Sequence, residues 1–236
     1  MSFFIPAGKL CVIVGENGCG KSTTVQLLTR LYDTTSGEIL IDGRPVHNFT
    51  LSSLRSAAGV MYQDYKHLPL TVYENILLGR PDSSHPQKEI EQAAISGGAY
   101  NLIQKLPAKF KTNLRPQNTG YSQSFHGTDI TGPFGSLIDA QKPVRLSGGE
   151  WQRLALSRSF MRNSNDVKLL CYDEPSASLD PNAEQEIFER LRSLRDGKTM
   201  IFVTHRFGYL TRHADLSKKS ILVRKLVDPS PGQYYT

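Results

Sequence analysis

The sequence of 236 residues is poor in cysteine and tryptophan and contains no long apolar run. Its three cysteines, Cys11, Cys19 and Cys171, include no C-x-x-C pair, so we expect neither a disulfide framework nor a cysteine zinc site, and the thiols fit a reducing compartment. No stretch approaches the roughly 18 consecutive apolar residues of a membrane-spanning helix. Residues 1–6 lack the basic and long apolar regions of a signal peptide. We therefore expect a soluble chain that does not cross a membrane by itself.

Dense basic patches are also missing, although the net charge is +6. No run of basic residues is longer than two, and the excess is split between residues 101–170, with a net charge of +6, and residues 205–236, with +4. A nucleic-acid-binding protein usually concentrates its charge in one patch or stripe. We interpret these segments as solvated basic faces, so nucleic acid is not an expected partner. The 39% of apolar residues is enough to bury a core without staples.

Short apolar runs alternate with helical patterns along the chain, which is typical of a parallel α/β sheet. The expected strands are 10–14, 37–41, 59–62, 168–172 and 199–204, and the expected helices are 21–31, 149–163 and 181–195. Residues 71–112 are helical in pattern, whereas the polar stretch 115–145 has no period. We expect a core of residues 1–62 and 165–215. A helical subdomain of residues 63–164, which contains the polar insert, would interrupt that core, and 216–236 would form a divergent tail.

The segment Gly15–Ser22 matches the phosphate-binding pattern G-x-x-x-x-G-K-[ST], between an expected strand and an expected helix. Glycines let the backbone bring its N–H groups close to phosphates, and the helix start adds partial positive charge. Lys21 can reach the β- and γ-phosphates, and the Ser22 hydroxyl can bind Mg²⁺. The alternative is a glycine-rich turn with a surface lysine, which the strand and helix context disfavours.

An apolar strand from Leu169 ends in two acids, Asp173 and Glu174. At the carboxyl edge of a parallel sheet, close to a phosphate-binding loop, Asp173 can hold Mg²⁺. Glu174 can then orient or deprotonate an attacking water. Taken alone, the pair is better explained as solvent-facing acids at a strand end, but the neighbouring phosphate-binding loop disfavours that explanation. Gln63 and His205 also follow expected strands, and their side chains would reach the same edge.

The segment Leu146–Glu150 combines a capping box, Ser147-x-x-Glu150, with two glycines in the first turn of the expected helix. The capping box accounts for the helix start, but Gly148 and Gly149 cost helix stability unless something approaches their N–H groups closely. A helix start with exposed N–H groups is an anion site. By contrast, Asp180 and Pro181 are sufficiently explained as an N-cap and a first helical residue.

Together these segments resemble the nucleotide-binding domain of ATP-binding cassette (ABC) transporters, over about residues 3–215. The order matches, with Walker A at 15–22, the glutamine loop at Gln63, the signature at 146–150, Walker B ending at Asp173, the D-loop at 178–180 and the switch histidine His205. The segments 151–158 and 204–206 are most similar to the exporter branch. The resemblance implies a phosphate-loop NTPase (RecA-like) core sheet with an inserted α-helical subdomain.

The resemblance also implies a mechanism. Two domains would pair head to tail, as a homodimer or heterodimer, with ATP between the Walker A of one and the signature of the other. The implied catalytic residues are Glu174, His205, Lys21 and Gln63. The implied ATP-binding residues are Gly15, Asn17, Gly18, Cys19, Gly20, Lys21, Ser22, Thr23, Ser147, Gly148, Gly149 and Asp180, and the implied Mg²⁺ ligands are Ser22, Gln63 and Asp173. The chain would power transmembrane transport through membrane domains on another chain, which would hold it at the cytosolic face of a membrane.

The sequence also departs from the family pattern. Family members usually carry an aromatic residue some twenty residues before Walker A that stacks on adenine, whereas fourteen residues precede Gly15 here. Residues 115–145 are longer than usual, and the tail after Asp215 is not recognisable. These departures are compatible with three origins of the chain: a fragment, an aberrant gene model or a divergent stand-alone domain. The alternative functions are a soluble ABC-type ATPase of translation or DNA maintenance, and a truncated regulatory chain that hydrolyses little ATP.

Overall fold

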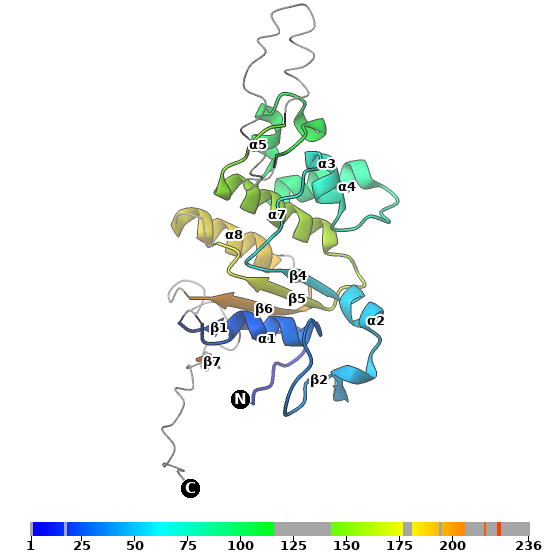
Figure 1. Cartoon of the computed structure of the whole chain (residues 1–236), viewed down its shortest axis with the longest axis vertical. Coiled ribbons are helices and arrows are strands. Elements are labelled where there is room, and N and C mark those ends of the chain that lie inside the picture. Colours follow the sequence, from blue (N-terminus) through cyan, green and yellow to red (C-terminus); the bar gives the residue numbers. More distant parts are fainter. Residues whose placement is uncertain are drawn as a thin grey trace, which may run out of the picture. The chain divides into compact units, whose positions relative to one another are not determined.

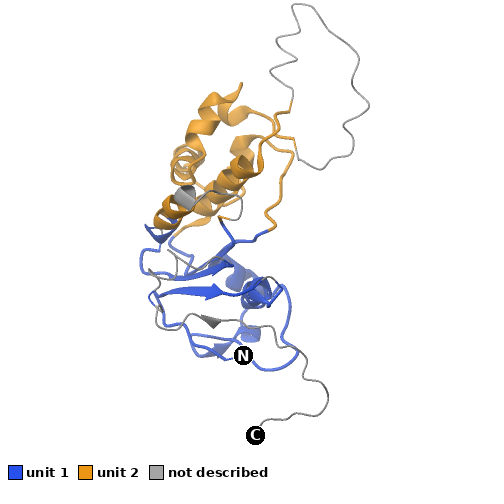
Figure 2. Ribbon diagram, turned by 90° about the vertical axis from the view of Figure 1, so that its left-hand side faces the viewer, with its two compact units in different colours: residues 1–63, 165–175, 191–236 blue, residues 64–164, 176–190 orange. Residues whose placement is uncertain are grey.

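The structure, a computed structural model, describes residues 2–16, 18–115, 143–176, 181–193, 195–205, 215 and 221–222. Residues 181–183 and 221–222 are described without their side chains. The chain divides into two compact units (Figure 2). Unit 1 comprises residues 1–63, 165–175 and 191–236, and unit 2 comprises residues 64–164 and 176–190. Each unit is described by itself.

Unit 1 is built on a five-stranded sheet in the order β4-β5-β6-β1-β7 (Figure 1). Every neighbouring pair of strands in this sheet is parallel. The strands are β1 (Leu10–Val14), β4 (Ala58–Met61), β5 (Leu169–Asp173), β6 (Thr199–Thr204) and β7 (Ile221–Leu222). The continuous apolar runs of the sequence thus form central strands that are buried on both faces. This arrangement confirms the predicted α/β fold with a parallel sheet.

The core of unit 1 forms where β1, β5 and β6 meet the helix α1 (Lys21–Leu28). Its buried members are Cys11, Ile13, Val25, Cys171, Ile201 and Val203. Burial raises the pKa of the Cys11 thiol to about 11 and that of Cys171 to about 12, so both remain protonated and pack as small apolar groups. The helix α1 is shorter than the predicted 21–31, because Thr29 is its C-cap and Arg30 has a φ of 49°.

The predicted strand 37–41 is largely wrong, since only Leu40–Ile41 (β2) is a strand. This strand pairs with β3 (Arg44–Pro45) in a small antiparallel hairpin. Asp42 and Gly43 form the turn with φ angles of 50° and 74°, which are typical of a two-residue type I′ loop. The short helices η1 (Val46–Asn48) and α2 (Leu51–Ser56) then lead into β4.

Unit 2 is helical. Its elements are α3 (Val72–Leu77), α4 (Pro86–Ser96), α5 (Tyr100–Lys105), η2 (Lys109–Lys111), α7 (Gly148–Arg162) and the greater part of α8 (Pro181–Ser193). The helical pattern of residues 71–112 is therefore several short helices. The break between α4 and α5 falls at Gly97 and Gly98, where a Cβ on Gly97 would lie 2.2 Å from Ser157 Oγ and Gly98 has a φ of 72°.

The helices of unit 2 enclose an apolar cluster around Trp151, Leu154 and Met161 of α7. Val72 and Ile76 of α3, Ile90, Ala93 and Ala94 of α4, and Ile103 of α5 complete most of it. The longest described helix, α7, has 15 residues. None of the helices in the described ranges combines the length and apolar composition needed to cross a bilayer.

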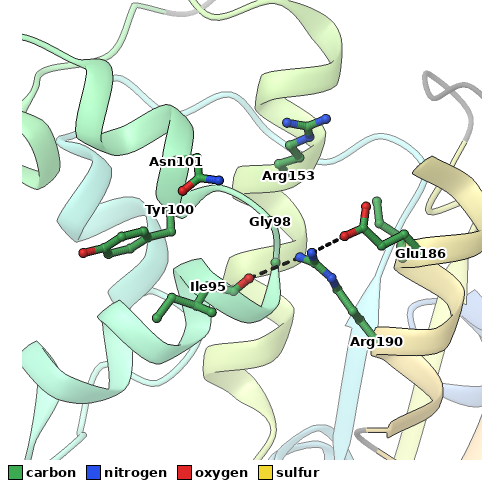
Figure 3. Close-up of a pocket in the computed structure, with 9 residues that line it drawn as sticks. Ile95, Gly98, Tyr100, Asn101, Arg153, Glu186 and Arg190 are labelled. Carbon is green, nitrogen blue, oxygen red and sulfur yellow. Dashed lines mark hydrogen bonds and ion pairs between the residues drawn. The ribbon is translucent and has the colours of Figure 1, made fainter. Parts of the chain in front are cut away.

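Arg190 of α8 satisfies the carboxyl end of α4 (Figure 3). Its guanidinium donates to the carbonyls of Ile95 and Ser96 at 3.2 and 3.3 Å and pairs with Glu186. A cation at this position satisfies carbonyls that have no partner within the helix and complements the helix dipole. Beside these groups is a pocket of about 300 Å³, and Arg153 of α7 contributes to its lining.

Candidate functional site

The loop between β1 and α1 has an open, left-handed backbone at two of its glycines. Gly18 and Gly20 have φ angles of 80° and 92°, and a Cβ at either would meet no described atom within 4 Å. Glycine is therefore required by the backbone conformation and not by crowding. Gly20 is the N-cap of α1, and no side chain in the described residues caps this helix start. The N–H groups of the first turn, at Lys21, Ser22 and Thr23, are thus available to an anion.

Lys21 lies beneath this loop, with 5% of its surface exposed. Its Nζ donates to the carbonyls of Gly15 and Glu16, each at 2.9 Å. The same Nζ lies 3.9 Å from Glu174 Oε1. These contacts compensate the burial of the ammonium group and hold its charge at the loop. Cys19 is buried in the loop at 8% exposure, and its N–H donates to the Glu16 carbonyl.

Asp173 is the last residue of β5 and is 1% exposed. Burial raises the pKa of this carboxyl group, and proximity to Glu174 raises it further, while a hydrogen bond from Ser22 and the charge of Lys21 oppose the shift. Its Oδ1 has no hydrogen-bond partner among the described residues. A buried carboxylate oxygen without a partner is costly, so this atom is prepared for a ligand.

Glu174 is the point where the polar groups of unit 1 converge. Its Oε1 lies 3.0 Å from His205 Nδ1, and its Oε2 accepts from Gln63 Nε2 at 3.4 Å. Gln63 comes two residues after β4, Glu174 directly after β5 and His205 directly after β6. Because β4, β5 and β6 are adjacent and parallel, their carboxyl ends bring these three side chains to one edge of the sheet. Lys21, the first residue of α1, also contacts Glu174.

The backbone of Glu174 is strained, with a φ of 50°. A left-handed conformation in a residue other than glycine costs about 1–3 kcal/mol and is found most often at functional sites. The N–H of Glu174 donates to the Val203 carbonyl at 2.9 Å, which continues the ladder between β5 and β6 and holds this turn. The whole Glu174 residue is 9% exposed, so its carboxylate is largely buried.

The donor set of unit 1 fits a magnesium ion. Mg²⁺ prefers oxygen ligands and is usually held by one or two protein groups together with phosphates. The unpartnered Asp173 Oδ1 and the neighbouring Ser22 hydroxyl supply such oxygens. A cation here would also favour the ionised form of Asp173, which burial alone disfavours.

Ser147, Gly148 and Gly149 lie in unit 2, at the start of α7. Ser147 is the N-cap, and the predicted capping box is present: the N–H of Ser147 donates to Glu150 Oε2 at 2.8 Å, and the N–H of Glu150 donates back to Ser147 Oγ. A Cβ on Gly148 would meet no described atom within 4 Å. The glycine at this position therefore leaves open space before the helix start. Two predicted site residues, Asn17 and Asp180, lie outside the described residues.

The sequence model of the ABC transporter family matches residues 1–177. The chain belongs to the ABC transporter family. It is 34% identical over 90% of its length to "ABC transporter B family member 1" of Arabidopsis thaliana. It is 37% identical over 87% of its length to "Iron-sulfur clusters transporter atm1, mitochondrial" of Aspergillus fumigatus.

A solved structure, "Structure of a bacterial Atm1-family ABC exporter with ATP bound", matches 87% of the chain with a TM-score of 0.70 and 33% identity. The chain is thus an exporter-like ABC nucleotide-binding domain with the ATP-binding fold of that family. It covers 14% of the Arabidopsis relative, 24% of the Aspergillus relative and 31% of the bacterial exporter chain.

One contact of the ABC signature was not expected from the sequence. The hydroxyl of Tyr65, two residues after Gln63, donates to the carbonyl of Gly148 at 3.2 Å. Tyr65 lies in a segment without helical or alternating periodicity, so only its closeness in sequence to Gln63 could have drawn attention to it.

Proposed function

We propose that this ABC domain is a Mg²⁺-dependent ATP hydrolase that powers transport across a membrane. It would act through membrane domains that lie outside these 236 residues and would pair head to tail with a second ABC domain at the cytosolic face of the membrane. The observation that carries the proposal is the convergence of Lys21, Gln63 and His205 on the Glu174 carboxylate, beside a glycine-rich helix start. The transport role is supported by the exporter relatives.

In the proposed reaction, the oxygen of a water molecule attacks the γ-phosphorus of ATP. The bond between that phosphorus and the β,γ-bridging oxygen breaks, so ADP and phosphate form. Glu174 orients the water and accepts its proton, which a base in hydrogen-bond reach can do. Mg²⁺ held by Ser22 and Asp173 would neutralise charge on the phosphate oxygens.

The neighbours of Glu174 have separate roles in this proposal. Lys21 and the N–H groups of the first turn of α1 bind the phosphates of the domain's own ATP. His205 fixes one oxygen of Glu174 and contacts the γ-phosphate. Gln63 holds the other oxygen and approaches the Mg²⁺ site. Ser147, Gly148 and Gly149 would bind the γ-phosphate of the ATP held by the second domain, which gives the N–H groups of Gly148 and Gly149 a ligand.

Phosphate release tests the catalytic part of the proposal. Glu174→Gln keeps the shape of the side chain but removes the base, so hydrolysis should fall by about 10²–10⁴-fold. Glu38→Gln is the matched control, because Glu38 is an exposed glutamate of the same unit, and it should hydrolyse ATP like the wild type. Equal rates in wild type and Glu174→Gln would instead favour a regulatory chain that hydrolyses little.

Light scattering tests the dimer. In the Glu174→Gln variant, ATP should remain bound and hold two domains together, so the molar mass should double when ATP is added with Mg²⁺. Removing Mg²⁺ with a chelator should abolish hydrolysis in the wild type, and adding Mg²⁺ back should restore it. A monomer at saturating ATP, with the membrane partner supplied, would contradict the head-to-tail arrangement.

A further inference from the structure

The segment that follows Gln63 contacts the first turn of α7 at two points, and both contacts lie within unit 2. The Tyr65 hydroxyl donates to the Gly148 carbonyl at 3.2 Å. The His67 ring stacks on the Trp151 ring, with centroids 4.4 Å apart and planes inclined by 10°. Gly148 and Trp151 are three residues apart, so they lie on the same face of the helix.

The two contacts are joined by a third. The rings of Tyr65 and His67 lie 5.6 Å apart at an angle of 44°, so Tyr65, His67 and Trp151 form a continuous series of aromatic rings. Trp151 is 1% exposed and packs into the apolar cluster of unit 2. The series therefore connects the residues after Gln63 to the buried apolar cluster of the helical unit, through the helix start that carries the signature.

The first turn of α7 needs such a support. Its two glycines have more backbone freedom than any other residue, and they disfavour the helix by about 0.5–1 kcal/mol each. The capping box restrains Ser147 and Glu150, but Gly148 has no side chain and no described atom within 4 Å of a Cβ position. The hydroxyl of Tyr65 supplies a restraint that the helix start lacks.

The atom that Tyr65 holds determines the direction of a neighbouring N–H group. The carbonyl of Gly148 and the N–H of Gly149 belong to one planar peptide group and point in opposite directions. A hydrogen bond that fixes the carbonyl thus also fixes the N–H of Gly149. In the proposed function, this N–H faces the γ-phosphate of the second domain's ATP.

We propose that Tyr65 is a positioning residue for the signature, and that the stack of His67 on Trp151 sets where Tyr65 lies. Through these contacts, the segment after Gln63 holds the Gly149 N–H in the direction that the γ-phosphate requires. The inference rests on the proposed function for its consequence, although the support of the helix start can be measured without it.

Tyr65→Phe tests the hydrogen bond while keeping the ring. Hydrogen exchange followed by mass spectrometry should become faster in peptides that contain residues 148–150. In the Glu174→Gln background, the ATP concentration that gives half of the dimer should rise about two- to tenfold, as expected for the loss of one hydrogen bond. The affinity of the isolated monomer for a fluorescent ATP analogue should not change, because Lys21 and its loop are untouched.

The control is Tyr100→Phe, which removes a hydroxyl that bonds Glu91 in the same unit and should change none of the three measurements. A second pair of variants tests the stack: His67→Phe should preserve wild-type exchange and dimer formation, whereas His67→Ala should resemble Tyr65→Phe.

Unchanged exchange at residues 148–150 in Tyr65→Phe overturns the inference, whatever the ATPase activity of the variant is. Equal weakening of monomer binding and dimer formation also overturns it, because it would indicate general loosening. A wild type that neither hydrolyses ATP nor dimerises, with faster exchange in Tyr65→Phe, would contradict the proposed function alone.

Discussion

The two compact units place their polar groups in opposite ways. Unit 1 buries charged side chains at the edge of its sheet: Lys21, Asp173 and Glu174 are 5%, 1% and 9% exposed. Unit 2 places the signature at an exposed helix start, where backbone N–H groups and the hydroxyl of Ser147 are the polar groups. In unit 2, the guanidinium of the half-buried Arg158 bonds the carbonyl oxygen and Oδ1 of Asn75, away from the signature.

This difference indicates that the polar groups of unit 1 act in the proposed reaction, whereas the contacts of unit 2 contribute to stability. In unit 1, desolvated charges and the strained backbone of Glu174 oppose folding and are retained because the proposed reaction uses them. In unit 2, the apolar cluster and the Arg158–Asn75 bonds stabilise a frame that presents backbone groups. We therefore expect substitutions of the buried charges of unit 1 to reduce activity and substitution of the half-buried Arg158 of unit 2 to reduce stability.

Lys21→Met gives the largest expected effect and tests the first half of this contrast. Methionine has a similar length but no charge for the phosphates, so ATP hydrolysis should fall by about 10²–10³-fold. The free energy of unfolding should fall by only about 1–2 kcal/mol, because the buried Gly15 carbonyl loses a donor while Glu174 keeps its contacts with Gln63 and His205. Phosphate release and urea unfolding measure the two quantities. Lys9→Met, at an exposed lysine of unit 1, is the control and should leave both unchanged; a loss of stability as large as the loss of activity would contradict the contrast.

Arg158→Met tests the second half. The guanidinium donates to the Asn75 carbonyl oxygen and Oδ1, each at 2.9 Å, and burial lowers its pKa. Its loss should lower the free energy of unfolding by about 2–3 kcal/mol, because it leaves buried acceptors without a donor. Arg153→Met is a close control on the same helix, since Arg153 is exposed and its side chain makes no hydrogen bond or ion pair with the described residues. Urea unfolding of this control should match the wild type within about 0.5 kcal/mol, and equal destabilisation by both variants would refute the role of the Asn75 bonds.

The sequence was sufficient for those parts of the fold that local patterns determine. The strand Leu10–Val14 and the start of α1 were predicted because a continuous apolar run is followed by a motif with one structural solution. The capping box of Ser147 and Glu150 was predicted for the same reason. The sequence also predicted a turn at Asp42 and Gly43, but not the strand Arg44–Pro45 that completes the hairpin. The division of 71–112 into separate helices was not predicted, because single residues such as Gly97 decide it.

Long-range contacts were beyond the sequence. Gln63 and Glu174 are 111 positions apart and meet only because β4 and β5 are neighbours in the sheet. The sequence predicted that both side chains reach the same edge of the sheet, but not that they contact each other, because strand order is not a local property. The Tyr65–Gly148 bond joins positions 83 residues apart and has no local signal at all. The functional roles of these residues stay predictions until the variants are measured.

The smallest expected effect concerns pH and the aromatic series of unit 2. Burial lowers the pKa of His67 below its usual value, with a smaller contribution from Arg158 and an opposing one from Asp64. His67 therefore binds a proton more readily in the unfolded chain, so its contribution to stability is complete above about pH 6.5 and is lost as the pH falls through the lowered pKa. His67→Phe should remove this part of the pH dependence of urea unfolding, while the other five histidines remain. Trp151 is the single tryptophan of the chain and stacks on His67, so its fluorescence should be quenched on protonation in the wild type and not in His67→Phe. Quenching in both proteins would show that a group other than His67 takes up the proton. It would contradict a role of the His67–Trp151 stack in the acid sensitivity of unit 2.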